Sequence, residues 1–278
     1  MGRLYHYTTP EALIGIFRNR CLWATNALFL NDSQEVAHGI ELARRKLRSL
    51  RDCASDDAQG ARIDWLVNEI RNVGTATSKF VFVCSLSADG DMLSQWRAYC
   101  RGGGFAVGFP ESELGDAIAS QQFALDAVVY EDEKQAAQID SVLDSIVVPW
   151  IRGAGAPVSD DDDRFKVSGT FVWELLRVGA KLKNSSFSEE RESRIVSLPE
   201  LKYDPEKLYF RARSGLVVPY IEINLPEQRV VDFWSRVEII IGPTRYPRES
   251  HASVYDLVRR FQGHAVAIRD SRIPFREW

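Results

Sequence analysis

Two glutamates and an arginine in the second half of the chain offer the clearest chemistry in the sequence. Glu190, Glu192 and Arg194 are spaced two residues apart within SFSEERESRIVSL. If this segment is a strand, all three side chains point to one face of a sheet, because successive residues alternate. So many charges do not fit a core, and they predict a cleft where a carboxylate can stabilise positive charge. A charged edge strand is the alternative.

Three polar or aromatic residues close a short strand-like segment at the start of the chain. His6, Tyr7 and Thr8 come directly before Thr9-Pro10-Glu11, whose N-cap, first-turn proline and acid predict a helix start. The free N–H groups and the dipole at a helix N-terminus favour anionic ligands. We therefore expect a ligand contact here, the alternative being a histidine that simply packs beside tyrosines.

The stretch from Lys79 to Phe109 joins a buried strand to a polar cluster. Its apolar run Phe80 to Cys84 is typical of a strand buried on both faces, and Ser85 and Ser87 would end that strand in two hydroxyls on one side. We expect a helix next, whose side chains gather amide, aromatic and guanidinium groups: Gln95, Trp96, Arg97 and Tyr99. The alternative is a strand–helix–strand unit with the tryptophan as a core plug.

A basic pair is expected on a hairpin further along. The segments Lys207 to Arg213 and Leu216 to Ile223 have strand-like composition, and Ser214-Gly215 between them suits a tight turn. Because they are two residues apart, Arg211 and Arg213 share one face of that hairpin.

The remaining segments mix strand and helix signals without a repeat or a linker. Strands are expected at Cys21–Thr25, Phe105–Phe109 and Val237–Ile241, and helices near residues 34–51, 165–183 and 250–262. We therefore predict an α+β fold made of a single domain over residues 1–278, with two packed mixed β-sheets and flanking helices.

Composition and missing motifs exclude several classes. Of the 278 residues, 45% are apolar and 27% charged, and the net charge of −4 gives no global basic field. No apolar run reaches about 18 residues and no signal-peptide pattern opens the chain, so we expect neither membrane insertion nor secretion, and a cytoplasmic location. Four cysteines without paired spacing predict neither a zinc site nor disulfides. No Walker loop, GxGxxG or GxSxG motif supports kinase, dehydrogenase or hydrolase chemistry.

Several groups of residues, in order along nearly the whole chain, resemble a bacterial family known as domain of unknown function 2971. They are LYHYT with the helix after it, WATNALFLND with Glu35, FVFVCSLS with LSQWRAY and GGFAVGF, FSEERESR, and EIIIGP with the closing RIPFR. The opening is also similar to the first strand and helix of the ADP-ribosyltransferase superfamily, particularly its DNA-modifying toxins. The chain departs from that pattern at Ser85-Leu86-Ser87, where a Ser-Thr-Ser tripeptide is usual.

This resemblance implies an ADP-ribosyltransferase-like fold and NAD as the substrate. It implies that His6 contacts the nicotinamide-side ribose, that Ser85 or Ser87 lies near the nicotinamide pocket, and that the catalytic acid is Glu192 or Glu190. The acceptor would be a macromolecule, whether protein, DNA or RNA, and the chain would act as a toxin or as an effector against phage.

The chemistry of NAD cleavage is compatible with these residue types. Breaking the bond between nicotinamide and ribose passes through an oxocarbenium-like cation, which needs a carboxylate, hydrogen bonds to the ribose and a stacking surface. The candidates in that order are Glu192 and Glu190, then His6 and Thr8, then Trp96 or Tyr99, with Arg97 or Arg194 on the pyrophosphate. Two alternatives stay open: plain NAD hydrolysis, and a non-catalytic module that binds a nucleotide or a nucleic acid in the same cleft. Arg211, Arg213 and Trp96 would serve the enzyme and the module alike.

Overall fold

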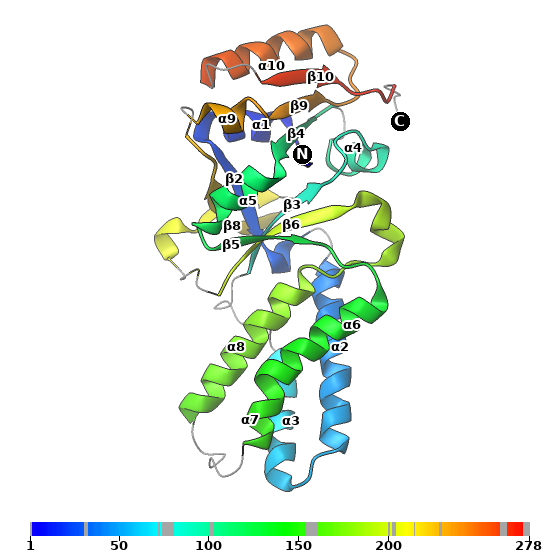
Figure 1. Cartoon of the computed structure of the whole chain (residues 1–278), viewed down its shortest axis with the longest axis vertical. Helices are drawn as coiled ribbons and strands as arrows, with labels where there is room; N and C mark the ends of the chain where they lie inside the picture. Colours follow the sequence, from blue (N-terminus) through cyan, green and yellow to red (C-terminus); the bar gives the residue numbers. More distant parts are fainter. Residues whose placement is uncertain are drawn as a thin grey trace.

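The structure is a computed structural model with an α+β architecture. It describes residues 2–30, 33–71, 73, 81–100, 103–153, 161–199, 201, 204–213, 215–227, 230–261 and 266–274. A mixed β-sheet occupies the middle of the molecule, one group of helices lies below it, and other helices lie above and beside it (Figure 1).

The strands are short and alternate with helices along the chain. They are β1 (Arg3–Thr8), β2 (Cys21–Asn26), β3 (Phe82–Ser87), β4 (Phe105–Pro110), β5 (Phe123–Ala127), β6 (Glu192–Ser197), β7 (Tyr209–Arg213), β8 (Leu216–Asn224), β9 (Glu238–Ile241) and β10 (Ala267–Asp270). The main path of the sheet runs β10-β9-β4-β1-β3-β2-β8-β7, while β6 pairs with β3 and β5 pairs with β6. The β9–β10 pair is parallel and the β1–β4 pair is antiparallel, which makes the sheet mixed.

The strand β3 is the branch point of this sheet. On one edge it pairs with β6 over its length, from Val83↔Val196 to Ser87↔Glu192. On the other edge it pairs first with β2, at Phe82 and Val83, and then with β1, at Ser87 only. The strands β1 and β2 therefore diverge in front of residues 84–86. The prediction of two packed sheets is wrong in this respect: within the described residues, hydrogen bonds join all named strands into one branched sheet.

Helices cover both faces of the sheet. Above and beside it lie α1 (Pro10–Asn19), α4 (Leu93–Tyr99), α5 (Glu111–Ala119), α9 (Val231–Trp234) and α10 (Pro247–Phe261). Below it lie α2 (Ser33–Asp52), α3 (Asp57–Arg71), α6 (Asp132–Val142), α7 (Val148–Arg152) and α8 (Asp161–Gly179), with the π-helix η2 (Leu143–Val147) between α6 and α7. Single turns of 3-10 helix complete the order as η1 (Ala27–Phe29), η3 (Ser185–Glu190) and η4 (Pro205–Lys207).

The alternation of β3 supplies both hydrophobic cores. Phe82, Cys84 and Leu86 belong to the core shared with α1, α5, α9 and α10, whereas Val81 and Val83 belong to the core shared with the lower helices. A strand buried on both faces reads as a continuous apolar run, which is the pattern that the sequence shows here. The predicted strand extends to Ser87 as expected, while its proposed start at Phe80 lies outside the described residues.

The helix α1 begins as the sequence predicts. Its N-cap is Thr9, whose side chain accepts a hydrogen bond from the Ala12 amide, and Pro10 occupies the first turn. The strand β1 ends directly before this cap, so Thr8 and His6 lie beside the helix N-terminus. None of the helices in the described part of the chain combines the length and the apolar character needed to cross a membrane.

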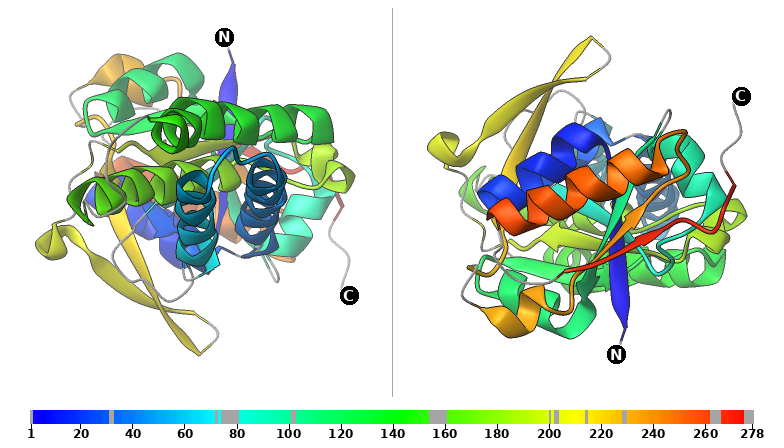
Figure 2. Two further views of the ribbon diagram at one scale, coloured as in Figure 1. Left: turned by 90° about the horizontal axis from the view of Figure 1, so that it is seen from below. Right: turned by 90° about the horizontal axis from the view of Figure 1, so that it is seen from above.

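The hairpin of β7 and β8 also follows the prediction. The two strands pair antiparallel from Tyr209↔Tyr220 to Arg213↔Leu216, and Gly215 takes a φ of 83° in the turn. Figure 2 shows this hairpin standing away from the rest of the molecule, at the end of the sheet next to β2.

Candidate functional site

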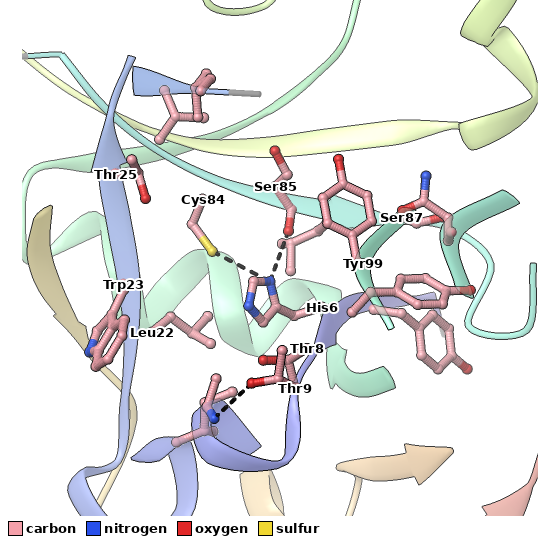
Figure 3. A pocket seen from close by; sticks show the side chains of 18 of the residues that line it. His6, Thr8, Thr9, Leu22, Trp23, Thr25, Cys84, Ser85, Ser87 and Tyr99 are labelled. Atoms are coloured by element: carbon pink, nitrogen blue, oxygen red, sulfur yellow. Dashed lines mark hydrogen bonds between the residues drawn. The ribbon is translucent and has the colours of Figure 1, made fainter. Parts of the chain in front are cut away.

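A cavity of about 590 Å³ opens where β1 and β2 diverge in front of β3. This volume lies within the range of about 300 to 1,000 Å³ typical of small-molecule sites. Its wall is contributed by β1, β2, β3 and β7, by the N-terminal half of α1, by the end of α4 and by the segment from Lys183 to Arg194. Figure 3 shows the His6 ring between β2 and β3, with Trp23 and Thr25 on one side and Ser85 and Tyr99 on the other.

Four charged side chains form a closed network in the wall of this cavity. The Lys183 ammonium donates to Glu190 Oε2 at 2.7 Å and to Glu192 Oε2 at 2.9 Å. Arg194 holds Glu192 in a bidentate contact, with Nε on Oε1 at 2.7 Å and Nη2 on Oε2 at 2.9 Å. Its Nη1 donates to the Ala180 carbonyl at 2.6 Å. Two cations and two carboxylates balance each other in a place where an unpaired charge would be costly.

This network determines the protonation states of Glu192 and Lys183. Burial alone would raise the pKa of the Glu192 carboxyl, but Arg194, Lys183 and the Ser85 hydroxyl lower it to about 2. Burial would also lower the pKa of the Lys183 ammonium, and the carboxylates Glu192 and Glu190 reverse this and raise it above its ordinary value. Glu192 is therefore ionised at neutral pH, and Lys183 is a fixed cation rather than a nucleophile.

The two glutamates meet in a way that the strand pattern did not predict. Glu190 does not belong to a strand: it ends η3, and β6 begins only at Glu192. Arg191 between them adopts left-handed backbone angles, with φ 41° and ψ 52°, which reverse the chain direction locally. As a result both carboxylates still reach the Lys183 ammonium. Within the described part of the chain Lys183 is the one hydrogen-bond partner of the Glu190 carboxylate, so Oε1 of this cavity-lining residue has no donor among these residues.

Lys183 is placed by contacts far from it in sequence. The residue before it, Leu182, forms a parallel bridge with Val129. The buried amide of Gln135 on α6 donates to the Lys183 carbonyl at 2.8 Å and to the Val129 carbonyl at 2.9 Å, and its Oε1 lies 2.9 Å from His38 Nε2 on α2. The sequence analysis placed Lys183 at the end of an expected helix, because nothing local in the sequence indicates this bridge.

His6 presents a hydrogen-bond acceptor to the cavity. Its Nδ1 lies 3.0 Å from the Ser85 carbonyl oxygen, and since a carbonyl only accepts, Nδ1 carries the proton. Burial lowers the pKa of His6, the Ser85 hydrogen bond partly offsets this, and the nearby Arg211 guanidinium lowers it further. The ring is therefore neutral at pH 7, which leaves the Nε2 lone pair available to a ligand hydroxyl.

Other predicted residues reach the same cavity. Besides His6, Glu190 and Glu192, the predicted residues that line it are Tyr7, Thr8, Ser85, Ser87, Gln95, Tyr99 and Arg194. The Ser87 hydroxyl donates to the Glu190 carbonyl at 2.9 Å and accepts from the Asp89 amide at 3.1 Å, so it positions the backbone beside the network. Gln95 and Tyr99 are four residues apart on α4, and this spacing puts both on the face of the helix that meets the cavity.

Trp96 and Arg97 do not line the cavity. The Trp96 ring is 4% exposed and packs edge-on against Tyr7, with ring centroids 4.7 Å apart. Its Nε1 donates to Asp91 Oδ1 at 2.9 Å, and α4 begins at Leu93 with Met92, not Asp91, at the N-cap. The stacking role that the sequence suggested for Trp96 is therefore dropped in favour of the core-plug alternative, and Tyr99 is the α4 aromatic residue that lines the cavity.

Two arginines and a tryptophan complete the opposite end of the cavity. Arg211 and Arg213 extend from β7 and Trp23 from β2, and all three line the wall. The sequence analysis placed the basic pair on one shared face, where it would serve the enzyme and the binding module alike, and it did not select Trp23. The alternation of residues along β7 was enough to place the two arginines on one face. It could not show that β2, which carries Trp23, lies on the same side of the cavity.

Thiol chemistry is not supported by the geometry. Cys84 Sγ lies 3.8 Å from His6 Nδ1, which resembles a cysteine–histidine pair. Burial, however, raises the pKa of the Cys84 thiol to about 12 and the side chain is 2% exposed. A thiolate nucleophile needs the opposite shift. Cys84 therefore acts as a small buried residue.

One comparison with known proteins finds a family of unknown function that is similar to part of the chain. A family model described as "Protein of unknown function (DUF2971)" matches residues 95–195. This range begins in α4 and ends in β6, so it carries Gln95, Tyr99, Lys183, Glu190, Glu192 and Arg194. The match supports the family resemblance drawn from the sequence. No curated protein and no solved structure matches the chain.

Proposed function

We propose that this chain is an NAD-consuming transferase of the ADP-ribosyltransferase type that modifies a macromolecule. One observation carries the proposal: a neutral histidine acceptor and a carboxylate held in its ionised form line a single cavity of about 590 Å³. These are the two groups that cleavage of a ribosyl bond through an oxocarbenium-like cation requires.

The residues take distinct roles in this reaction. His6 Nε2 accepts a hydrogen bond from a ribose hydroxyl and orients the sugar, and the Tyr99 ring provides a surface for the nicotinamide. As the bond between the ribose carbon and the nicotinamide nitrogen breaks, its electron pair leaves with nicotinamide and positive charge develops on the ribose. The Glu192 carboxylate stabilises that charge, because its lowered pKa keeps it ionised at neutral pH.

The second glutamate suits a different task. Both oxygens of Glu192 already accept hydrogen bonds from Arg194, and Lys183 adds a third, so this group is a poor proton acceptor. Glu190 lines the cavity with one oxygen on Lys183, and no described residue donates to the other. We assign it the proton that the acceptor nucleophile loses when it forms the new bond to the ribose carbon.

The test is to follow both products of the reaction. Purified protein is incubated with NAD labelled in its adenosine part and with cell extract, while nicotinamide release and label incorporation into protein, DNA and RNA are measured. We expect release together with incorporation into one class of macromolecule. The Glu190→Gln variant should reduce incorporation strongly, while Glu131→Gln, which changes an exposed acid that does not line the cavity, should leave it unchanged.

Other results would name a different function. Release without incorporation would identify an NAD glycohydrolase, in which water is the acceptor. Absence of release with every extract, combined with retained nucleotide binding, would identify a non-catalytic binding module. A toxin or an effector against phage, as the resemblance implies, would also slow bacterial growth when expressed, and the Glu190→Gln variant would relieve that effect.

A further inference from the structure

Two arginines on one strand face the cavity without an acidic partner. Arg211 and Arg213 both extend from β7 into the wall, and no described carboxylate forms an ion pair with either of them. Arginines inside proteins are normally paired, because a desolvated charge is costly. The pair therefore represents positive charge that the described residues leave uncompensated at this end of the cavity.

The hairpin holds these side chains in place without neutralising them. Arg211 Nη2 donates to the Thr25 hydroxyl at 2.8 Å, and its guanidinium lies 5.6 Å from the centroid of the Trp23 ring. Arg213 Nη1 donates to the Phe29 carbonyl at 3.4 Å. The Arg211 Nε is buried and has no hydrogen-bond partner, although a buried N–H group is normally satisfied.

The electrostatic cost of this arrangement is visible in Arg211 itself. Burial lowers the pKa of its guanidinium, and the like charge of Arg213 lowers it further. An anion between the two side chains would remove the repulsion and satisfy the free donors. Residues two apart on a strand are about 6.5 Å apart at their backbones, so two long side chains can converge on one extended, doubly charged group. Paired guanidiniums bind phosphate oxygens through several N–H donors at once.

We propose that Arg211 and Arg213 form a binding site for the diphosphate of a nucleotide. In naming that nucleotide as the ADP-ribosyl part of NAD, the proposal rests on the proposed function; the anion site itself rests on the hairpin geometry. The site replaces both earlier candidates for the pyrophosphate. Arg194 donates hydrogen bonds to Glu192 and to the Ala180 carbonyl, and Arg97 does not line the cavity.

The arrangement gives the cavity two chemically different ends. The network of Glu190, Glu192, Lys183 and Arg194 is neutral as a whole, whereas the β7 end carries two positive charges. His6 lies between them, close enough to Arg211 for that charge to affect its titration. A ligand with a diphosphate at one end and a sugar that becomes cationic at the other matches this polarity.

The experiment measures binding of non-reacting probes by isothermal titration calorimetry. The probes are ADP-ribose, ADP and nicotinamide riboside, which lacks a diphosphate. The proteins are the wild type, Arg211→Gln, Arg213→Gln, the double variant and the control Lys207→Gln, which removes a charge next to the same hairpin from a side chain that is 80% exposed. We expect the double variant to lose about 100-fold or more in affinity for ADP-ribose and ADP, with Lys207→Gln and nicotinamide riboside binding unaffected.

Each outcome decides the proposal separately from the enzyme activity. Loss of ADP-ribose binding in the double variant supports it even when no NAD is consumed. Unchanged affinity of the double variant for ADP-ribose overturns the diphosphate site and leaves the proposed function standing. The same conclusion follows if the wild type binds neither ADP nor ADP-ribose but still releases nicotinamide. Loss of binding to a single-stranded oligonucleotide with unchanged ADP-ribose affinity overturns it in favour of a nucleic-acid contact. Arg211→Lys keeps the charge, so partial recovery of binding with an unchanged melting temperature separates lost charge from misfolding.

Discussion

Replacing Glu192 by glutamine tests the charged network most directly. The substitution keeps the size of the side chain but removes the negative charge, which leaves Lys183 and Arg194 buried beside one carboxylate instead of two. We expect a folded protein with a clearly lower free energy of unfolding at neutral pH, because a buried ion pair that loses one partner exposes the full desolvation cost of the other.

The size of this effect follows from the titration of Glu192. Its pKa falls from an ordinary value of 4.5 to about 2. This difference corresponds to roughly 3 kcal/mol by which the folded state favours the ionised carboxylate. Because the folded pKa is the lower one, this stability is fully present above pH 4.5 and is lost as the pH falls toward 2. About half of it should remain at pH 3. Removing one partner of a buried pair gives a similar range of about 3 to 5 kcal/mol.

The measurement is urea unfolding followed by tryptophan fluorescence at several pH values between 7 and 3. The difference in unfolding free energy between wild type and Glu192→Gln should be about 3 kcal/mol at pH 7 and should shrink as the pH falls. Glu131→Gln is the matched control, since Glu131 pairs with Lys134 on the surface at 60% exposure and the substitution should leave the unfolding free energy nearly unchanged. A loss below 1 kcal/mol for Glu192→Gln, or a difference independent of pH, would refute the network described here.

A second substitution shows whether the cost comes from the unpaired cation. In the double variant Lys183→Met with Glu192→Gln, the ammonium that lost its partner is also removed. The combined loss should be smaller than the sum of the two single losses, because the residues share one interaction. Strict additivity would mean that Lys183 and Glu192 do not stabilise each other.

Three further substitutions separate structural from chemical roles. Trp96→Ala should lower the unfolding free energy by about 3 to 5 kcal/mol in thermal or urea melts while the folded fraction binds ADP-ribose normally, and weaker binding would restore a ligand role for the ring. His6→Asn should weaken NAD binding in calorimetry. In the wild type the lowered pKa of His6 makes the free energy of unfolding decrease as the pH drops below about 6.5, and this pH dependence should be absent from the variant. Gln135→Leu leaves the Lys183 carbonyl without its amide donor, while the Val129 carbonyl keeps the Lys183 backbone N–H at 3.1 Å. It should therefore destabilise by about 1 to 3 kcal/mol and reduce nicotinamide release, and release at the wild-type rate per folded molecule would remove the positioning role of Gln135.

Local patterns predicted the elements of the fold well. The proline and threonine at the start of α1, the apolar run of β3 and the turn residues of the β7–β8 hairpin each have a short-range physical cause, and the structure contains all three. The shared parity of Glu192 and Arg194 was also sufficient to predict their contact, because residues two apart on a strand must share a face.

The errors arose where a single residue or a distant partner decides the geometry. Arg191 in left-handed conformation ends the helical turn that carries Glu190, and no propensity of arginine indicates this. The burial of Trp96 depends on where α4 begins: with Leu93 as its first residue, Trp96 turns toward Tyr7 and Gln95 toward the cavity. The branching of the sheet at β3 depends on which strands become neighbours, and the sequence pattern of each strand contains no information about that.

The helices below the sheet help to position the site although they lie at a distance from the cavity. They contribute no carboxylate or histidine to the cavity among the described residues, yet Gln135 on α6 binds the backbone on either side of the bridge that places Lys183. His38 on α2 contacts the same amide, so two helices of this layer converge on one buried polar group. A buried amide of this kind costs free energy unless every partner is in place. The helical layer therefore stabilises one geometry of the segment that carries Lys183, and through the two ion pairs it determines how Glu190 and Glu192 face the ligand.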